Sequence, residues 1–224
     1  MGTRTAFPAE ENAFGCAGNE PLPDLRFRAL LSDADWAALP MTVRRRFSKR
    51  LAEGRTAIYV GEVLEAWMSG AGWLLAQALR LIGGPLPTSR DVHVPSVVAV
   101  TEDLASGGQV WTRLYVRRRG FPQVIHSSKR FAGPTGLEEH LGCGIGMTLA
   151  MRVEDHALVF RSHQYFVDFG RWRRLTLPRW ATPGTLTVRH IAAEGQRFVF
   201  AMEIVHPWLG KLVRQSAIFQ EAGP

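Results

Sequence analysis

Two expected strands carry side chains suited to acid–base or ligand-binding chemistry on one of their faces. Each strand has an aliphatic face, and the opposite face mixes aromatic rings with ionisable groups: Trp111, Arg113 and Tyr115 in residues 109–117, and Arg161, His163 and Tyr165 in residues 157–169. Such a face either meets solvent, with long cations reaching outward, or lines a pocket where ionisable groups polarise or protonate a substrate. The residues alone leave both interpretations open.

The pocket interpretation gives each candidate residue a role. Proton transfer or hydrogen bonding falls to His163, Tyr165 and Glu139. The cations Arg113 and Arg161 would hold an anionic or carbonyl end of a ligand. Large aromatic rings would form the walls: Trp111, Trp172 and Trp180.

Established chemical signatures are missing from the sequence. There is no GxSxG, HExxH or P-loop motif, and no GxGxxG motif opens an expected helix. Cys16 and Cys143 are the two cysteines, without a CxxC pair or histidines at metal-ligand spacing, which argues against a structural zinc site. We therefore expect neither a metal nor a cofactor.

Composition and charge restrict the class of protein. Hydrophobic residues make up 46% of the 224 residues, which excludes a disordered chain. The net charge of +7 fits a polyanionic partner, a membrane surface or simply a basic protein. The N-terminus has no apolar core of a secretory signal, so we expect a cytoplasmic protein with reduced thiols.

The elements that must position these side chains are mostly strands. Residues 1–23 lack periodicity and predict a mobile arm, whereas 24–224 predict one domain. Residues 67–82 are apolar nearly all round, which predicts a covered helix ending at Gly83-Gly84-Pro85. Alternating patterns between short turns predict strands at 55–65, 92–102, 109–117, 122–131, 137–141, 145–154, 157–169, 185–192, 197–206 and 211–220.

The short connections between these strands predict an antiparallel meander. Because twist accumulates across so many strands, the meander should curl. We expect a mainly β, α+β fold, an open barrel or helix-grip shape whose sheet wraps around the apolar helix. A concave sheet of this kind commonly holds a small molecule.

Short helices are expected before the sheet, and one of them is strongly basic. In residues 42–52, Val43, Phe47 and Leu51 form one apolar stripe, and the other faces carry several arginines and lysines. Most basic helix faces are simply solvated, and the alternative here is contact with nucleic acid or anionic lipid.

From Leu25 to Phe219 the chain resembles a bacterial family filed as domain of unknown function 4166. The stretches that carry the resemblance are LRFRALLSDADWAALPMTVRRRF, WTRLY, GLEEHLG, LTLPRWATP and RFVFAMEIVHPWLGKLVRQ. The resemblance implies no established activity, and it implies that the domain occurs alone or fused behind dehydrogenase-like domains. The matching polar positions are Trp111, Arg113, Glu139, His206 and Arg214.

Glu139 has a second reason for attention. A carboxylate in an apolar curved sheet needs a cation such as Arg113 or Arg214. That pair would be structural unless it opens onto a cavity, where it would become an acid–base or anchoring group. The resemblance implies arginine at the position where this sequence has His140.

Three functions remain. The leading hypothesis is a cofactor-free domain that binds a hydrophobic small molecule and cyclises or isomerises it, mainly by holding it in a reactive fold. The alternative is a non-catalytic carrier or accessory domain that presents a lipid or quinone-like molecule to a partner oxidoreductase, with contact to a membrane surface. Nucleic-acid binding is disfavoured, because the arginine clusters lie in separate elements without a recognition-module pattern.

Overall fold

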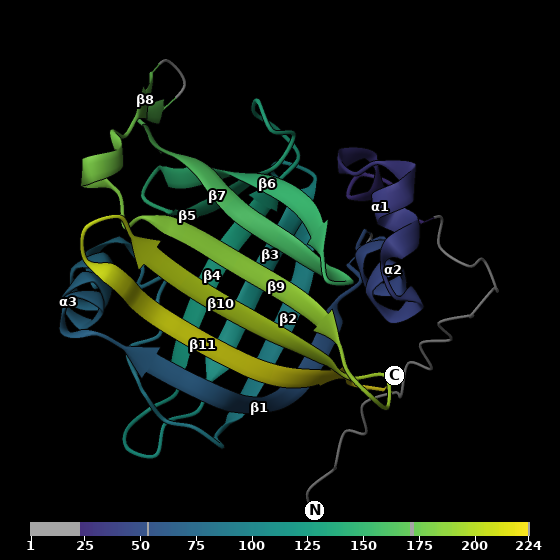
Figure 1. Cartoon of the computed structure of the whole chain (residues 1–224), viewed down its shortest axis with the longest axis horizontal. Coiled ribbons are helices and arrows are strands. Elements are labelled where there is room, and N and C mark those ends of the chain that lie inside the picture. Colours follow the sequence, from purple (N-terminus) through teal and green to yellow (C-terminus); the bar gives the residue numbers. More distant parts are fainter. Residues whose placement is uncertain (1–22, 53, 171–172, 224) are drawn as a thin grey trace, which may run out of the picture.

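Ten antiparallel strands form a closed β-barrel in the computed structural model, which describes residues 23–52, 54–170 and 173–223 (Figure 1). The barrel strands are β1 (Ala57–Met68), β2 (Pro95–Asp103), β3 (Gly108–Tyr115), β4 (Gln123–Arg130), β5 (Glu138–Gly142), β6 (Ile145–Glu154), β7 (Ala157–Asp168), β9 (Thr185–Ala192), β10 (Phe198–His206) and β11 (Gly210–Glu221). A short strand, β8 (Arg174–Thr176), pairs with the C-terminal end of β7.

The helical elements are brief. They are η1 (Arg28–Leu30), α1 (Asp33–Ala38), α2 (Met41–Phe47), α3 (Gly70–Ala78), η2 (Leu79–Ile82) and η4 (Arg179–Ala181). None of the helices in the described ranges combines the length and hydropathy needed to cross a membrane.

The sheet is a meander that returns on itself. Strands β1 to β7 pair in sequence order, β7 also pairs with β9, and β9, β10 and β11 follow in turn. The ring closes where β11 pairs with β1, with Tyr59 opposite Glu221 at one end and Met68 opposite Val213 at the other. The sheet is therefore a closed barrel and not the open one expected.

Local turn chemistry sets the hairpins. Between β6 and β7 the chain reverses through Asp155 and His156, which both adopt left-handed conformations, at φ 49° and 59°. Two consecutive left-handed residues form the type I′ turn, whose twist matches that of the paired strands. The short antiparallel connection predicted between the strands at 145–154 and 157–169 is confirmed.

The predicted strands agree well with the observed ones. All ten predicted strands overlap barrel strands with ends within about three residues, and those at 145–154 and 185–192 have the predicted limits. Strand β8 was not predicted, because three residues are too short for a periodic signal. Residues 1–22 of the expected arm lie outside the described part of the chain.

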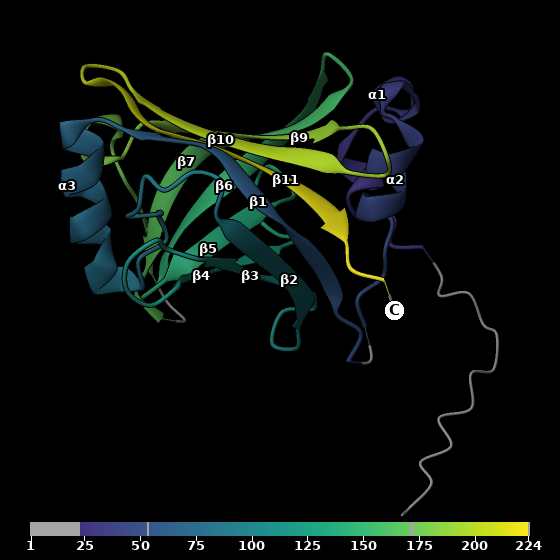
Figure 2. The same cartoon turned by 90° about the horizontal axis from the view of Figure 1, so that it is seen from below.

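The apolar helix does not lie inside the sheet. Figure 2 shows α3 across one end of the barrel, with α1 and α2 at the opposite end. Ser69 accepts a hydrogen bond from the Gly72 amide, and the Ser69 amide donates to the Leu212 carbonyl. Trp73 and Leu74 are exposed on its outer side, so only part of α3 is covered.

The boundaries of two expected helices also change. Residues 67 and 68, expected in the apolar helix, instead finish β1, where they pair with β11. Helix α2 ends at Phe47, several residues before the predicted end. Of its predicted apolar stripe, Val43 and Phe47 are buried on the helix, whereas Leu51 lies beyond the helix end and is half-buried.

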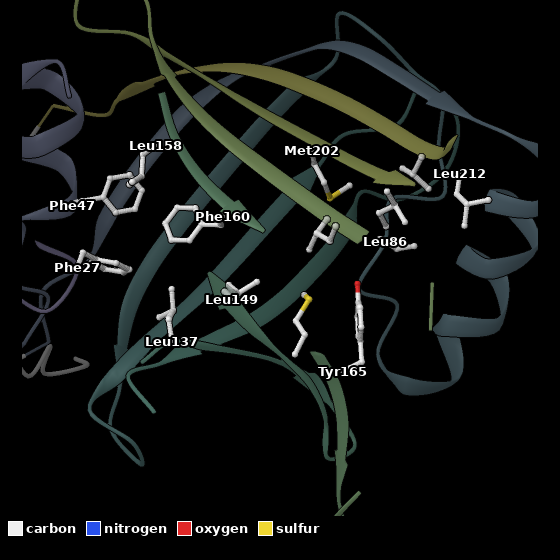
Figure 3. Close-up of a cluster of buried hydrophobic side chains, with 14 of the residues drawn as sticks. Phe27, Phe47, Leu86, Leu137, Leu149, Leu158, Phe160, Tyr165, Met202 and Leu212 are labelled. Atoms are coloured by element: carbon white, nitrogen blue, oxygen red, sulfur yellow. The ribbon is translucent and has the colours of Figure 1, made fainter. Parts of the chain in front are cut away.

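The core beside α1 and α2 is aromatic. Phe27, Phe47 and Phe160 pack with ring centroids 5.2 to 6.3 Å apart, whereas Leu86, Tyr165 and Leu212 lie toward α3 (Figure 3). Aromatic packing of this kind adds directional contacts to the burial of apolar area.

We predict that Phe160→Ala lowers the free energy of unfolding by about 3–5 kcal/mol, because it removes a ring that is 1% exposed and leaves a cavity. Chemical denaturation measures the change. Leu104→Ala is the control, because this side chain is 87% exposed and should alter stability by less than about 0.5 kcal/mol. Equal effects of the two substitutions would contradict the assigned core.

Candidate functional site

A cavity of about 60 Å³ lies inside the barrel. Its apolar walls include Leu79, Leu86, Leu141, Met147, Met202 and Ile204. Its polar lining comprises Arg113, Lys129, Glu139, Tyr165 and His190, with the Trp111 ring beside them. An apolar enclosure with a few convergent polar groups is the usual composition of a small-molecule site.

Three adjacent strands place an ionic cluster in this cavity. Lys129 on β4 lies directly opposite Glu139 on β5, and Arg113 extends from the neighbouring β3. Lys129 Nζ and Arg113 Nη2 lie 3.2 Å and 3.3 Å from the same carboxylate oxygen, Glu139 Oε1. Arg113 Nη2 also donates to Ser127 Oγ at 2.8 Å.

The cluster keeps Glu139 ionised. Burial raises the pKa of Glu139, but Lys129, Arg113 and Ser127 outweigh burial and lower the pKa to about 2. Burial lowers the pKa of Lys129, and Glu139 opposes that shift. Glu139 is therefore an anion at neutral pH and a weak proton acceptor.

His190 lies beside this cluster without a charge of its own. It is 2% exposed and packs among the rings of Phe47, Phe160 and Phe200, at centroid distances of 5.0, 5.6 and 5.5 Å. Burial, followed by the positive charges of Arg46, Lys129 and Arg113, holds its pKa well below the ordinary histidine value. Nδ1 of His190 has no hydrogen-bond partner among the described residues.

Arg46 reaches a second, smaller cavity from helix α2. This cavity of about 10 Å³ shares Trp111, Arg113, His190 and Phe200 with the larger one. The Arg46 guanidinium stacks over Phe198, 3.6 Å from the ring centroid. Burial lowers its pKa to about 10, so it stays cationic at neutral pH.

Tyr165 is the other candidate donor in the larger cavity. Burial raises the pKa of the Tyr165 phenol to about 12, so the hydroxyl stays protonated and can donate a hydrogen bond. Trp111 is buried, and its Nε1 donates to Gln109 Oε1 at 3.2 Å. Trp111 therefore meets the cavity through its apolar ring.

The structure brings together four of the ten residues singled out from the sequence: Trp111, Arg113, Glu139 and Tyr165. It places His163 and Arg161 on the outside of the barrel, in a groove of about 650 Å³ whose lining also includes Glu203 and Tyr165. The separation of His163 from the cavity follows from a bulge, because the register between β6 and β7 shifts after Thr148.

The remaining predicted residues lie away from the cavity. Trp180 is 68% exposed, and Trp172 lies outside the described residues. His206 Nδ1 accepts the amides of Trp208 and Leu209 at 3.2 and 3.3 Å, which stabilises the β10–β11 turn. Of the two cations expected beside Glu139, Arg113 is there, whereas the exposed Arg214 pairs with Glu65 at 3.2 Å.

Sequence reasoning missed Lys129, His190 and Arg46. A signal existed for His190, which follows Leu186 and Val188 at every second position and so shares their inward face. Lys129 shares a face with Ile125 and Ser127 in the same way. Arg46 gave no comparable signal, because one arginine among several in a basic helix is usually solvated.

No group of three histidine, cysteine, aspartate or glutamate residues in ranges 23–52, 54–170 and 173–223 is placed to hold a metal ion. Residues 39–219, which span most of the chain, match the family model described as Domain of unknown function (DUF4166). Neither the curated proteins nor the solved structures contain a match.

We predict that Glu139→Gln destabilises the fold by about 3–5 kcal/mol, because it leaves Lys129 and Arg113 buried without their counter-ion. Denaturant unfolding at pH 7 measures the loss. Glu203→Gln is the control, because its pair with Lys211 is partly exposed and exposed pairs contribute about 0–1 kcal/mol. Equal losses in the two variants would show that the buried cluster contributes no more to stability than a partly exposed ion pair.

The pH dependence gives a separate prediction. Because its folded pKa lies below the ordinary carboxyl value, Glu139 stabilises the fold fully above about pH 5 and loses this contribution as the pH falls toward 2. The wild-type unfolding free energy should therefore fall more steeply across this range than that of Glu139→Gln. Asp103, whose pKa is also about 2, titrates in both proteins and cancels. If the unfolding free energies of the two proteins changed in parallel with pH, the low pKa of Glu139 would be contradicted.

Proposed function

We propose that this chain, which belongs to the DUF4166 family, binds a hydrophobic small molecule inside its barrel. The description of the family names no activity. The observation that carries this proposal is the cavity inside the barrel, which has mainly apolar walls and one polar cluster. Burial of apolar ligand surface in such a cavity supplies the binding free energy.

The size of the cavity has a consequence for how a ligand fits. A volume of about 60 Å³ holds only a few water-sized groups. A larger ligand must displace wall side chains, and the walls include the flexible Met147 and Met202. We therefore expect the cavity to widen around its ligand.

The second candidate function is cofactor-free cyclisation or isomerisation in the same cavity. The observation that favours it is the protonated Tyr165 hydroxyl, which can donate a hydrogen bond to a substrate carbonyl. Two features favour binding over catalysis: Glu139 is held as a weak base by two cations, and His163 faces the outer groove. Delivery of the bound molecule to a partner enzyme is the carrier form of the same proposal.

We predict that Val188→Phe weakens binding of the neutral apolar dye Nile red at least tenfold, because a phenyl ring at this position fills the cavity. Fluorescence titration measures the affinity, and circular dichroism checks that the variant folds.

Ile191→Phe on the same strand is the matched control. Ile191 is 37% exposed and lies outside the cavity lining, so the same added ring there should leave dye affinity unchanged. Undiminished binding by a folded Val188→Phe protein would reject the interior site.

A further inference from the structure

The two interior cavities have an excess of positive charge. Their linings contain three cationic side chains, Arg46, Arg113 and Lys129, and one carboxylate, Glu139. Guanidinium groups stay protonated in proteins, so the two arginines alone outnumber the carboxylate even where burial disfavours the Lys129 ammonium.

The donors of these cations are only partly used. Glu139 Oε1 receives both Lys129 Nζ and Arg113 Nη2, while Arg113 Nε has no acceptor among the described residues. Arg46 Nε and Nη2 are also buried without an acceptor in that part of the chain. The carboxylate whose charge acts on Arg46 is Glu221, which is exposed and pairs with Lys49.

His190 lies in the wall that the two cavities share, and the linings of these cavities contain the three cations. Burial, and after it the charges of all three cations, lowers the pKa of His190. As a neutral ring it adds no compensating charge, and its Nδ1 has no hydrogen-bond partner among the described residues. Because uncompensated buried charge is costly, the excess of positive charge favours an anion in the cavity.

Building on the proposed function, we infer that the ligand is an amphipathic carboxylate, with its anionic end against Arg113 and Lys129 and its apolar part along Met147 and Met202. The planar guanidinium of Arg113 matches the geometry of a carboxylate. The apolar walls exclude a fully polar anion, because they offer it few hydrogen-bond partners.

The test compares decanoate with decanol, which have the same chain and differ in the charge of the head group. Isothermal titration calorimetry on the full chain at pH 7.5 gives both affinities. An apolar cavity without excess charge would favour decanol, because burying an ionised carboxylate is costly. We expect wild-type protein to bind decanoate at least tenfold more tightly than decanol.

Variants locate the effect. Lys129→Met should weaken decanoate binding at least tenfold and leave decanol binding within about threefold, because it removes one cation and retains the chain-binding walls. Arg152→Met is the matched control, because it removes a positive charge from an exposed position on β6. If Lys129→Met does not fold, Arg46→Met should reduce the same preference, since Arg46 supplies positive charge from the other cavity.

The outcomes separate the two proposals. If decanol and decanoate bind with equal affinity and Val188→Phe abolishes both, the apolar site stands and the carboxylate inference is wrong. If neither binds, both proposals are wrong. If Arg152→Met reduces decanoate affinity as much as Lys129→Met, the preference reflects overall charge and the interior assignment is overturned.

Discussion

The pairing of the first strand with the last is the constraint on which the rest of this structure depends. Strands β1 and β11 pair along most of their length, and this contact converts a curled meander into a closed ring. Closure leaves no barrel edge for a neighbouring chain to extend. It also creates an interior shielded from water, where apolar walls and a few charges can act on each other at low dielectric.

The sequence predicted the parts of this fold that depend on local pattern. The ten predicted strands and their short turns follow from alternation and turn residues, which act over a few positions. Closure depends on the register between β1 and β11, far apart in the chain, and no local pattern encodes it. The position of α3 was missed for a related reason: apolar residues all round a helix predict cover, but Trp73 and Leu74 are partly uncovered.

Only part of the candidate site could be predicted from the sequence, and the reason is geometric. Alternation correctly grouped Trp111 with Arg113, because β3 runs without a bulge against both neighbours. It grouped His163 with Tyr165, but with the register shift between β6 and β7 only Tyr165 lines the inner cavity, whereas both residues line the outer groove. A single extra residue reverses the face of every position beyond it, so a bulge defeats an argument from parity.

The charged interior and the packing at the two ends of the barrel together bear on where a ligand enters. Buried cations lower the stability of a fold unless opposite charges or hydrogen bonds compensate them. Natural proteins retain such destabilising groups chiefly at functional sites. At the end beside α1 and α2, the rings of Phe27, Phe47 and Phe160 pack against one another. At the other end Leu79 and Leu86, in and after η2, line the cavity. On the proposed function the ligand therefore enters beside α3, because displacing these aliphatic side chains disturbs less of the core than parting three interlocked aromatic rings.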